Sequence, residues 1–216
     1  MVVKSSIIHP LRHLHNEREL LTPKFKYIES RHAVAWVDGG SIPIHSVRRF
    51  QAGVRDGMHT PDEVMQRKLE GLSESQIGNY VTAKATSRAI LRIHGAVYEG
   101  GVKVGENVTF EQVPDDGIVL CFARRNHRPI LDHLKKSDPT CIEVLDPLRL
   151  YALFCEQLGQ EGLVANCSYT STIQRNHFLK SKLDEVLEEF RMFWPLADTA
   201  WVQLPPGIGR IVALPV

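Results

Sequence analysis

The chain has 216 residues, of which 43% are hydrophobic and 24% are charged, and its formal net charge is +1. These are globular values that argue against disorder, and a charge so close to zero excludes a global field that would recruit nucleic acid or membrane. The length suits one domain with a well-buried core, so we predict a single domain over residues 1–216.

The first predicted elements are a strand that runs into a short helix over residues 24–37. The Asp-Gly-Gly sequence at 38–40 ends that helix, because glycine adopts the left-handed turn at little cost. A second strand is expected over residues 41–46, where Pro43 indicates an edge or entry position.

A helix start is predicted at residues 60–63. Their sequence, Thr-Pro-Asp-Glu, has a hydroxyl cap, a proline in the first turn and acids at the positive end of the helix dipole. We therefore expect a polar helix after it, which residues 73–76 restart and which continues to about Ser87.

The second half is rich in strand patterns. Residues 90–94 alternate, and residues 102–110 alternate around a glycine turn, which suggests paired antiparallel strands. The apolar run at 117–123 fits a central buried strand. The remaining expected elements are a helix over 148–158, a strand over 164–170, a helix over 184–191 and closing strands over 201–204 and 210–214. Together these elements predict an α+β fold.

Several function classes lack their sequence signals. No apolar run approaches the ~18–20 residues of a membrane span, and the first ten residues lack the core of a signal peptide. The four cysteines are widely spaced, so we expect reduced core residues of a cytosolic protein. No metal site is predicted, because the three histidines at positions 9, 13 and 15 have no cysteine or carboxylate cluster beside them.

The last quarter is the most informative stretch. It brings Glu188, Glu189 and Arg191 next to an aromatic segment, and a carboxylate at an apolar wall is an arrangement that tunes acid–base or cation-stabilising chemistry. The alternative is an amphipathic helix end with a solvated acidic face. Positions four apart share a helix face, so for Glu189 to face inward and Glu185 outward we expect an extended chain near Glu188 and a strand over 190–194.

Residues 124–128, Arg-Arg-Asn-His-Arg, form the best basic patch of the chain. They follow the predicted buried strand directly, and arginines grouped in this way suit contact with phosphate. The alternative is a solvated loop.

Four short motifs occur in a fixed order: Lys24-Phe-Lys-Tyr27, Ile42-Pro-Ile-His-Ser46 with Arg49-Phe50, Val119-Leu-Cys-Phe122, and Phe178-Leu-Lys180 with Glu189-Phe-Arg191. This order resembles an uncharacterised bacterial family with the pattern YKY … FNDP … CFS … FLK … E-Y-R. The family is associated with the ADP-ribosyltransferase-like fold, a split antiparallel sheet that holds NAD in a central cleft. The chain departs from the pattern at residues 49–52, where Arg-Phe-Gln-Ala replaces the Asn-Asp-Pro element.

The resemblance implies specific roles. Cleavage of the nicotinamide–ribose bond develops an oxocarbenium-like cation, which the late glutamate would stabilise. The implied catalytic residues are Glu189, Tyr27 and His45. The implied NAD-binding residues are Lys26, Ser46, Arg49 and Arg191. Leu187 stands where arginine-modifying members have the first glutamate of a Glu-x-Glu pair, which argues against arginine as the acceptor.

The function predicted on this basis is that of an NAD-dependent ADP-ribosyltransferase-like enzyme of the cytoplasm, of the toxin or phage–host conflict type. Its partners would be NAD and an acceptor macromolecule, which is DNA, RNA or protein, with no membrane. Two alternatives stay open. One is a non-catalytic nucleic-acid-binding regulator that uses the patch from Arg124 to Arg128, and the other is a nuclease.

Overall fold

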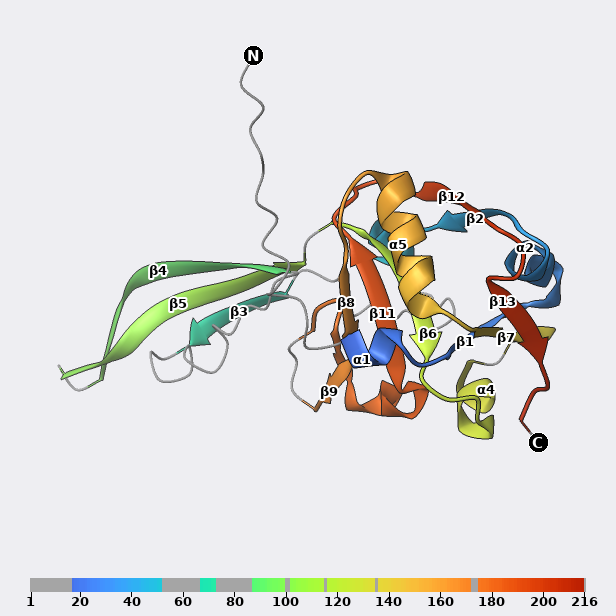
Figure 1. The fold of residues 1–216 in the computed structure, drawn as a ribbon. Coiled ribbons are helices and arrows are strands. Elements are labelled where there is room, and N and C mark those ends of the chain that lie inside the picture. Colours follow the sequence, from blue (N-terminus) through green and yellow to red (C-terminus); the bar gives the residue numbers. More distant parts are fainter. Residues whose placement is uncertain are drawn as a thin grey trace, which may run out of the picture.

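The apolar segments of the chain assemble into a six-stranded sheet, which forms the body in Figure 1. The computed structural model describes residues 17–51, 67–72, 87–99, 102–114, 116–134, 136–171 and 175–215. The sheet order is β13 (Gly209–Val212), β7 (Pro139–Val144), β1 (Lys24–Glu29), β6 (Ile118–Ala123), β11 (Glu189–Trp194) and β8 (Leu163–Asn166), and neighbouring strands run antiparallel. The fold is therefore α+β with a mostly antiparallel sheet, in agreement with the predicted class.

Both faces of this sheet are covered, and all residues of β6 and β11 are buried. On one face, Phe122 and Trp194 pack with Trp36 of α2 (Ala33–Val37) and Phe154 of α5 (Pro147–Leu158). On the other face, a second cluster includes residues of α4 (Arg128–Leu134) and of the 3-10 helix η5 (Lys182–Leu187). Each large apolar side chain buried there contributes about 1.5–3 kcal/mol, so the two central strands carry much of the core.

Local sequence accounts for the longest helix, α5. The Asp146 side chain accepts a hydrogen bond from the backbone N–H of Arg149 at 2.9 Å, and Pro147 occupies the first turn. At the other end Gly159 has a φ of 69° and caps the helix in the left-handed conformation. The helix predicted over residues 148–158 is confirmed.

The first predicted elements are also confirmed. After α1 (Glu17–Leu20), β1 leads through η2 (Ser30–His32) into α2, and Gly39 turns the chain with a φ of 87°. The next strand, β2 (Gly40–Ile44), pairs with β12 (Ala200–Leu204) in a separate two-stranded sheet, before η3 (Val47–Gln51). Strands β12 and β13 correspond to the two closing strands that the sequence predicted.

A three-stranded sheet extends away from the body in Figure 1. It contains β3 (Arg67–Leu72), β5 (Val102–Pro114) and β4 (Ser87–Glu99). The predicted polar helix is therefore wrong over residues 67–72. Pairing of this segment with β5 overrides the helix propensity of its residues. The two predicted starts of this helix, at residues 60–63 and 73–76, lie outside the described residues. The expected turn at Gly105 is also wrong, because β5 continues through it beside a register shift near Val97.

The last quarter corrects one prediction and confirms another. The helix expected over 184–191 ends at Leu187 as η5, and Glu188 adopts a left-handed conformation with a φ of 40°. The chain then runs as β11, so the expected extended segment is confirmed. Residues 164–170 divide between β8 and β9 (Ser168–Thr170), which pairs parallel with β10 (Leu179–Ser181). No helix among the described residues is long and apolar enough to cross a membrane.

Candidate functional site

The six-stranded sheet is divided between β1 and β6. These two strands share the single aligned pair Phe25–Ala123, whereas β1 aligns six residues with β7 and β6 aligns six with β11. Further along β6, the backbone N–H of Val119 donates to the His45 carbonyl at 3.4 Å, and that of Val47 donates to the Gly117 carbonyl at 2.8 Å. We call the region bordered by β1, β6 and residues 45–47 the split.

Lys26 crosses the split. Its Nζ donates a hydrogen bond to the carbonyl of Cys121 on β6 at 3.0 Å, so a side chain supplies a bond between strands where the backbone ladder stops. The ammonium lies 5.3 Å from the ring centre of Phe122 and 5.8 Å from that of Trp36. Burial lowers the pKa of Lys26 to about 8, and the charge of Lys136 acts in the same direction.

Tyr27 is the next residue of β1 and therefore belongs to the opposite face of the sheet. It is buried, and its hydroxyl donates to Oδ1 of Asn126 at 2.7 Å, while the Asn126 amide donates to the Ala213 carbonyl at 2.9 Å. Burial raises the pKa of Tyr27. The phenol is thus neutral and fixed in place on the β1 border of the split.

The other border carries the second predicted motif. The Arg49 guanidinium is exposed, and its Nη1 lies 3.0 and 2.9 Å from the two ring nitrogens of His45. The Ser46 backbone N–H donates to the Thr199 hydroxyl at 3.2 Å, and Ser46 forms an isolated bridge with Ile118. These predicted residues are therefore grouped at the start of β6.

Glu189 lies in a different place. It pairs across the sheet with Ala123, the last residue of β6, so five residue steps or about 16 Å of strand separate it from the level of Ser46. Its side chain is fully buried. Lys180 forms an ion pair with its Oε1, and Nε of Arg191 donates to its Oε2 at 2.7 Å. Glu185, in contrast, is 52% exposed at its side chain, as expected.

The groups around Glu189 form what we call the ion cluster: Glu189, Arg191, Lys180, Asp184 and His133. Asp184 lies 3.9 Å from Nζ of Lys180 and 3.2 Å from Nε2 of His133. Arg191 also donates to the His177 carbonyl at 2.7 Å. Because each oxygen of Glu189 has a cation beside it, the cluster joins η5 and β10 to the sheet, and full burial keeps the carboxylate away from a substrate.

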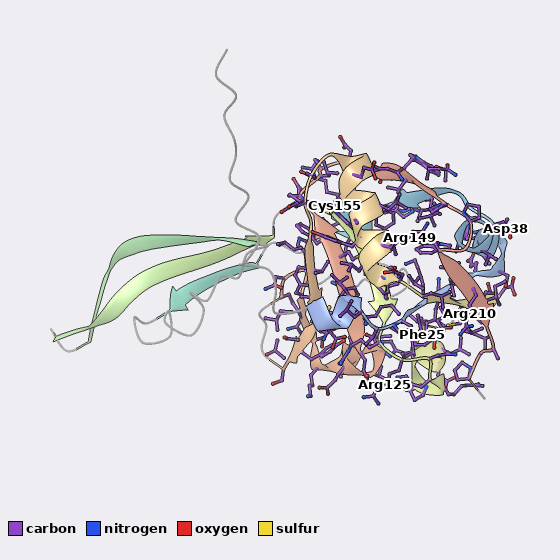
Figure 2. The ribbon with its side chains drawn as sticks, in the orientation of Figure 1. Phe25, Asp38, Arg125, Arg149, Cys155 and Arg210 are labelled. Atoms are coloured by element: carbon purple, nitrogen blue, oxygen red, sulfur yellow. The ribbon has the colours of Figure 1, made fainter. Side chains whose placement is uncertain are left out.

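The basic patch at 124–128 is largely neutralised. Arg124 lies 3.2 Å from Glu19, Arg125 lies 3.0 Å from Glu188, and Arg128 lies 2.8 Å from Asp132. Figure 2 shows Arg125 at the lower end of the body. A patch in which each guanidinium has a carboxylate partner offers little net charge to a phosphate backbone.

Glu188 has no individual role in the sequence motifs, but its backbone conformation is unusual. Glu188 is the one non-glycine residue with a positive φ among the described residues. It opens β11 beside the end of β6, where its carbonyl accepts from the Arg124 N–H at 3.0 Å, and its side chain is 27% exposed. Sequence gives no signal for such a conformation, because left-handed residues are usually glycine or asparagine.

The described residues contain no group of three or more His, Cys, Asp or Glu side chains that could hold a metal ion, and none of the four cysteines forms a disulfide. The scan against protein-family models found no match, and neither the curated proteins nor the solved structures contain a match to this chain.

Proposed function

We propose that this protein is an NAD-using, ADP-ribosyltransferase-like enzyme that binds the dinucleotide along the split. One observation carries the proposal. The sheet divides between β1 and β6, and its two borders hold the two motifs whose roles the sequence resemblance implied, with Lys26 and Tyr27 on one side and His45 and Ser46 on the other.

The charges at the split suit a pyrophosphate. Lys26 brings an ammonium to the border of β1, and Arg49 brings an exposed guanidinium held against the His45 ring. Arginine presents a planar set of donors that matches phosphate oxygens, and lysine adds a point charge. The phosphates of NAD would lie between these two cations.

The reaction needs a carboxylate near the ribose, because the bond to nicotinamide breaks with the development of positive charge on the sugar. The resemblance pointed to Glu189, but Lys180 and Arg191 occupy both of its oxygens. We assign the role to the neighbouring Glu188 instead. It is partly exposed, and its ion pair is with the largely exposed Arg125 at 3.0 Å. A left-handed backbone that costs about 1–3 kcal/mol for a non-glycine residue is typical of functional positions.

The acceptor and the compartment belong to the same proposal. The missing Glu-x-Glu pair argues against arginine as the acceptor, which leaves nucleic acid or another protein side chain. Four cysteines without a disulfide suit a reducing compartment such as the cytoplasm.

The test is incubation of the purified protein with NAD, with the release of nicotinamide followed by chromatography and NAD binding followed by calorimetry. We expect binding and slow release, both weakened in Arg49→Met. Arg210→Met is the matched control, because Arg210 is an exposed arginine paired with Glu143 on the outer strand β13. Absence of NAD binding contradicts the proposal, as does salt-sensitive nucleic-acid binding or metal-dependent nucleic-acid cleavage without any consumption of NAD.

A further inference from the structure

Three lysines of the body, Lys24, Lys26 and Lys180, hold their ammonium groups against protein atoms, and they differ in their counter-ions. Lys24 has Glu19 at 3.4 Å and also donates to the Thr22 carbonyl at 3.1 Å. Lys180 has the carboxylates of the ion cluster around it. Among the residues that the structure describes, Lys26 has no carboxylate within ion-pair distance.

The surroundings of Lys26 disfavour its charge. Its hydrogen-bond acceptor is a neutral carbonyl, and its other close neighbours are the rings of Phe122 and Trp36, which are almost fully buried. A desolvated amine without a counter-ion loses its proton more easily than an exposed one. The pKa of about 8 described above agrees with this geometry: burial is the largest cause and lowers the pKa of Lys26, Lys136 lowers it further, and Cys121 and Glu189 raise it. The residue as a whole is partly buried, and its ammonium is the part held against the carbonyl and the rings.

We infer that Lys26 is a nucleophilic amine that forms an imine with small carbonyl compounds. Lysines activated by an apolar environment are the ones that proteins use for this chemistry. The nitrogen lone pair attacks the carbonyl carbon and gives a carbinolamine. Loss of one water molecule, which carries away the carbonyl oxygen and two hydrogens, leaves a carbon–nitrogen double bond. The inference goes beyond the proposed function and does not require bound NAD.

The matched control is Lys182. It is 59% exposed and lies 2.7 Å from Glu185, so it is the more accessible lysine and has a carboxylate beside it. At pH 7.5, an amine with a pKa near 8 has on the order of 100-fold more neutral form than one with an ordinary lysine pKa. Partial burial reduces this advantage, and we expect Lys26 to react at least ~10-fold faster than Lys182.

The experiment treats the full chain with acetaldehyde and sodium cyanoborohydride, in the absence of NAD, and measures the ethylation of each lysine by peptide mass spectrometry. The rate at Lys26 should reach half of its maximum near pH 8. Ethylation of Lys26 no faster than that of Lys182, or a Lys26 rate that still rises above pH 10 like that of an ordinary lysine, overturns the inference. Because NAD is absent, neither result depends on whether the protein uses NAD.

Discussion

The ion cluster and the split both hold charged side chains away from water, but they satisfy those charges differently. In the ion cluster two cations, Lys180 and Arg191, face two carboxylates, Glu189 and Asp184. At the split, Lys26 faces a carbonyl and two rings. A saturated set of charges fixes one structure, and a cation without a counter-ion keeps free capacity for a ligand or a reaction. Burial of charge therefore does not by itself indicate a catalytic centre.

The largest effect is expected from Glu189→Gln. Glu189 is fully buried, and removing its charge leaves Arg191 without this carboxylate and Lys180 with the more distant Asp184 at 3.9 Å. We expect a loss of about 3–5 kcal/mol in the free energy of unfolding, measured by urea titration. Glu185→Gln, at an exposed position with one surface pair, should change it by less than about 1 kcal/mol. Equal effects for the two variants would contradict a saturated ion cluster.

The next effect is on turnover. Glu188→Gln should reduce NAD consumption about a hundredfold, equivalent to about 3 kcal/mol, because it removes the charge proposed to stabilise the ribosyl cation. Stability should stay within about 1 kcal/mol, because the partner of Glu188 is a largely exposed arginine. Steady-state nicotinamide release measures the first quantity and thermal unfolding the second. Unchanged turnover would remove Glu188 from the mechanism.

A smaller effect concerns pH. The pKa of Lys26 is about 8 in the folded protein and near 10.4 in an unfolded chain, so between these values the unfolded state binds more protons. Stability should therefore rise with pH in this window, because the penalty for the buried charge is fully present below pH 8 and is lost progressively as the pH rises towards 10.4. Between pH 7.5 and 9.5 we expect a rise of about 1–2 kcal/mol relative to Lys26→Met. Parallel pH profiles of the two proteins would show that Lys26 keeps its ordinary pKa.

The smallest effect is expected from Arg125→Gln. Arg125 is 70% exposed and paired with Glu188, so its loss should change stability by less than about 1 kcal/mol. Binding to a random DNA oligonucleotide, followed by fluorescence anisotropy at low salt, should be weak and unchanged. A clear drop in affinity would support the regulator alternative.

Part of this structure could be predicted from sequence. The buried strand β6, the capped helix α5 and the turn after α2 depend on local patterns and are confirmed. Strand β3 was mistaken for a helix because its pairing with the distant β5, and not its own residues, decides its conformation. The helix predicted over residues 184–191 is too long, because a short apolar stretch is compatible with both the helical and the strand period of hydrophobic residues.

The candidate site was predictable only in its motifs. The family resemblance implies that Lys26 and Ser46 bind the same ligand, and both residues contact β6. The ion pairing of Glu189 could not be predicted from sequence, because its partner Lys180 lies on another element and no spacing rule relates the two residues. The left-handed Glu188 was equally hidden, since its conformation is imposed by the junction between η5 and β11.

The single aligned pair between β1 and β6 has a mechanical consequence. Hydrogen bonding along each half of the sheet is continuous, but across the split the backbone provides little continuity, so the halves are linked by packing and by the Lys26 side chain. Cooperative opening units follow such boundaries. Amide exchange should therefore report two protection levels, one for β13, β7 and β1 and another for β6, β11 and β8. A ligand that binds both borders of the split would link the two halves of the sheet, and the two protection levels would become one.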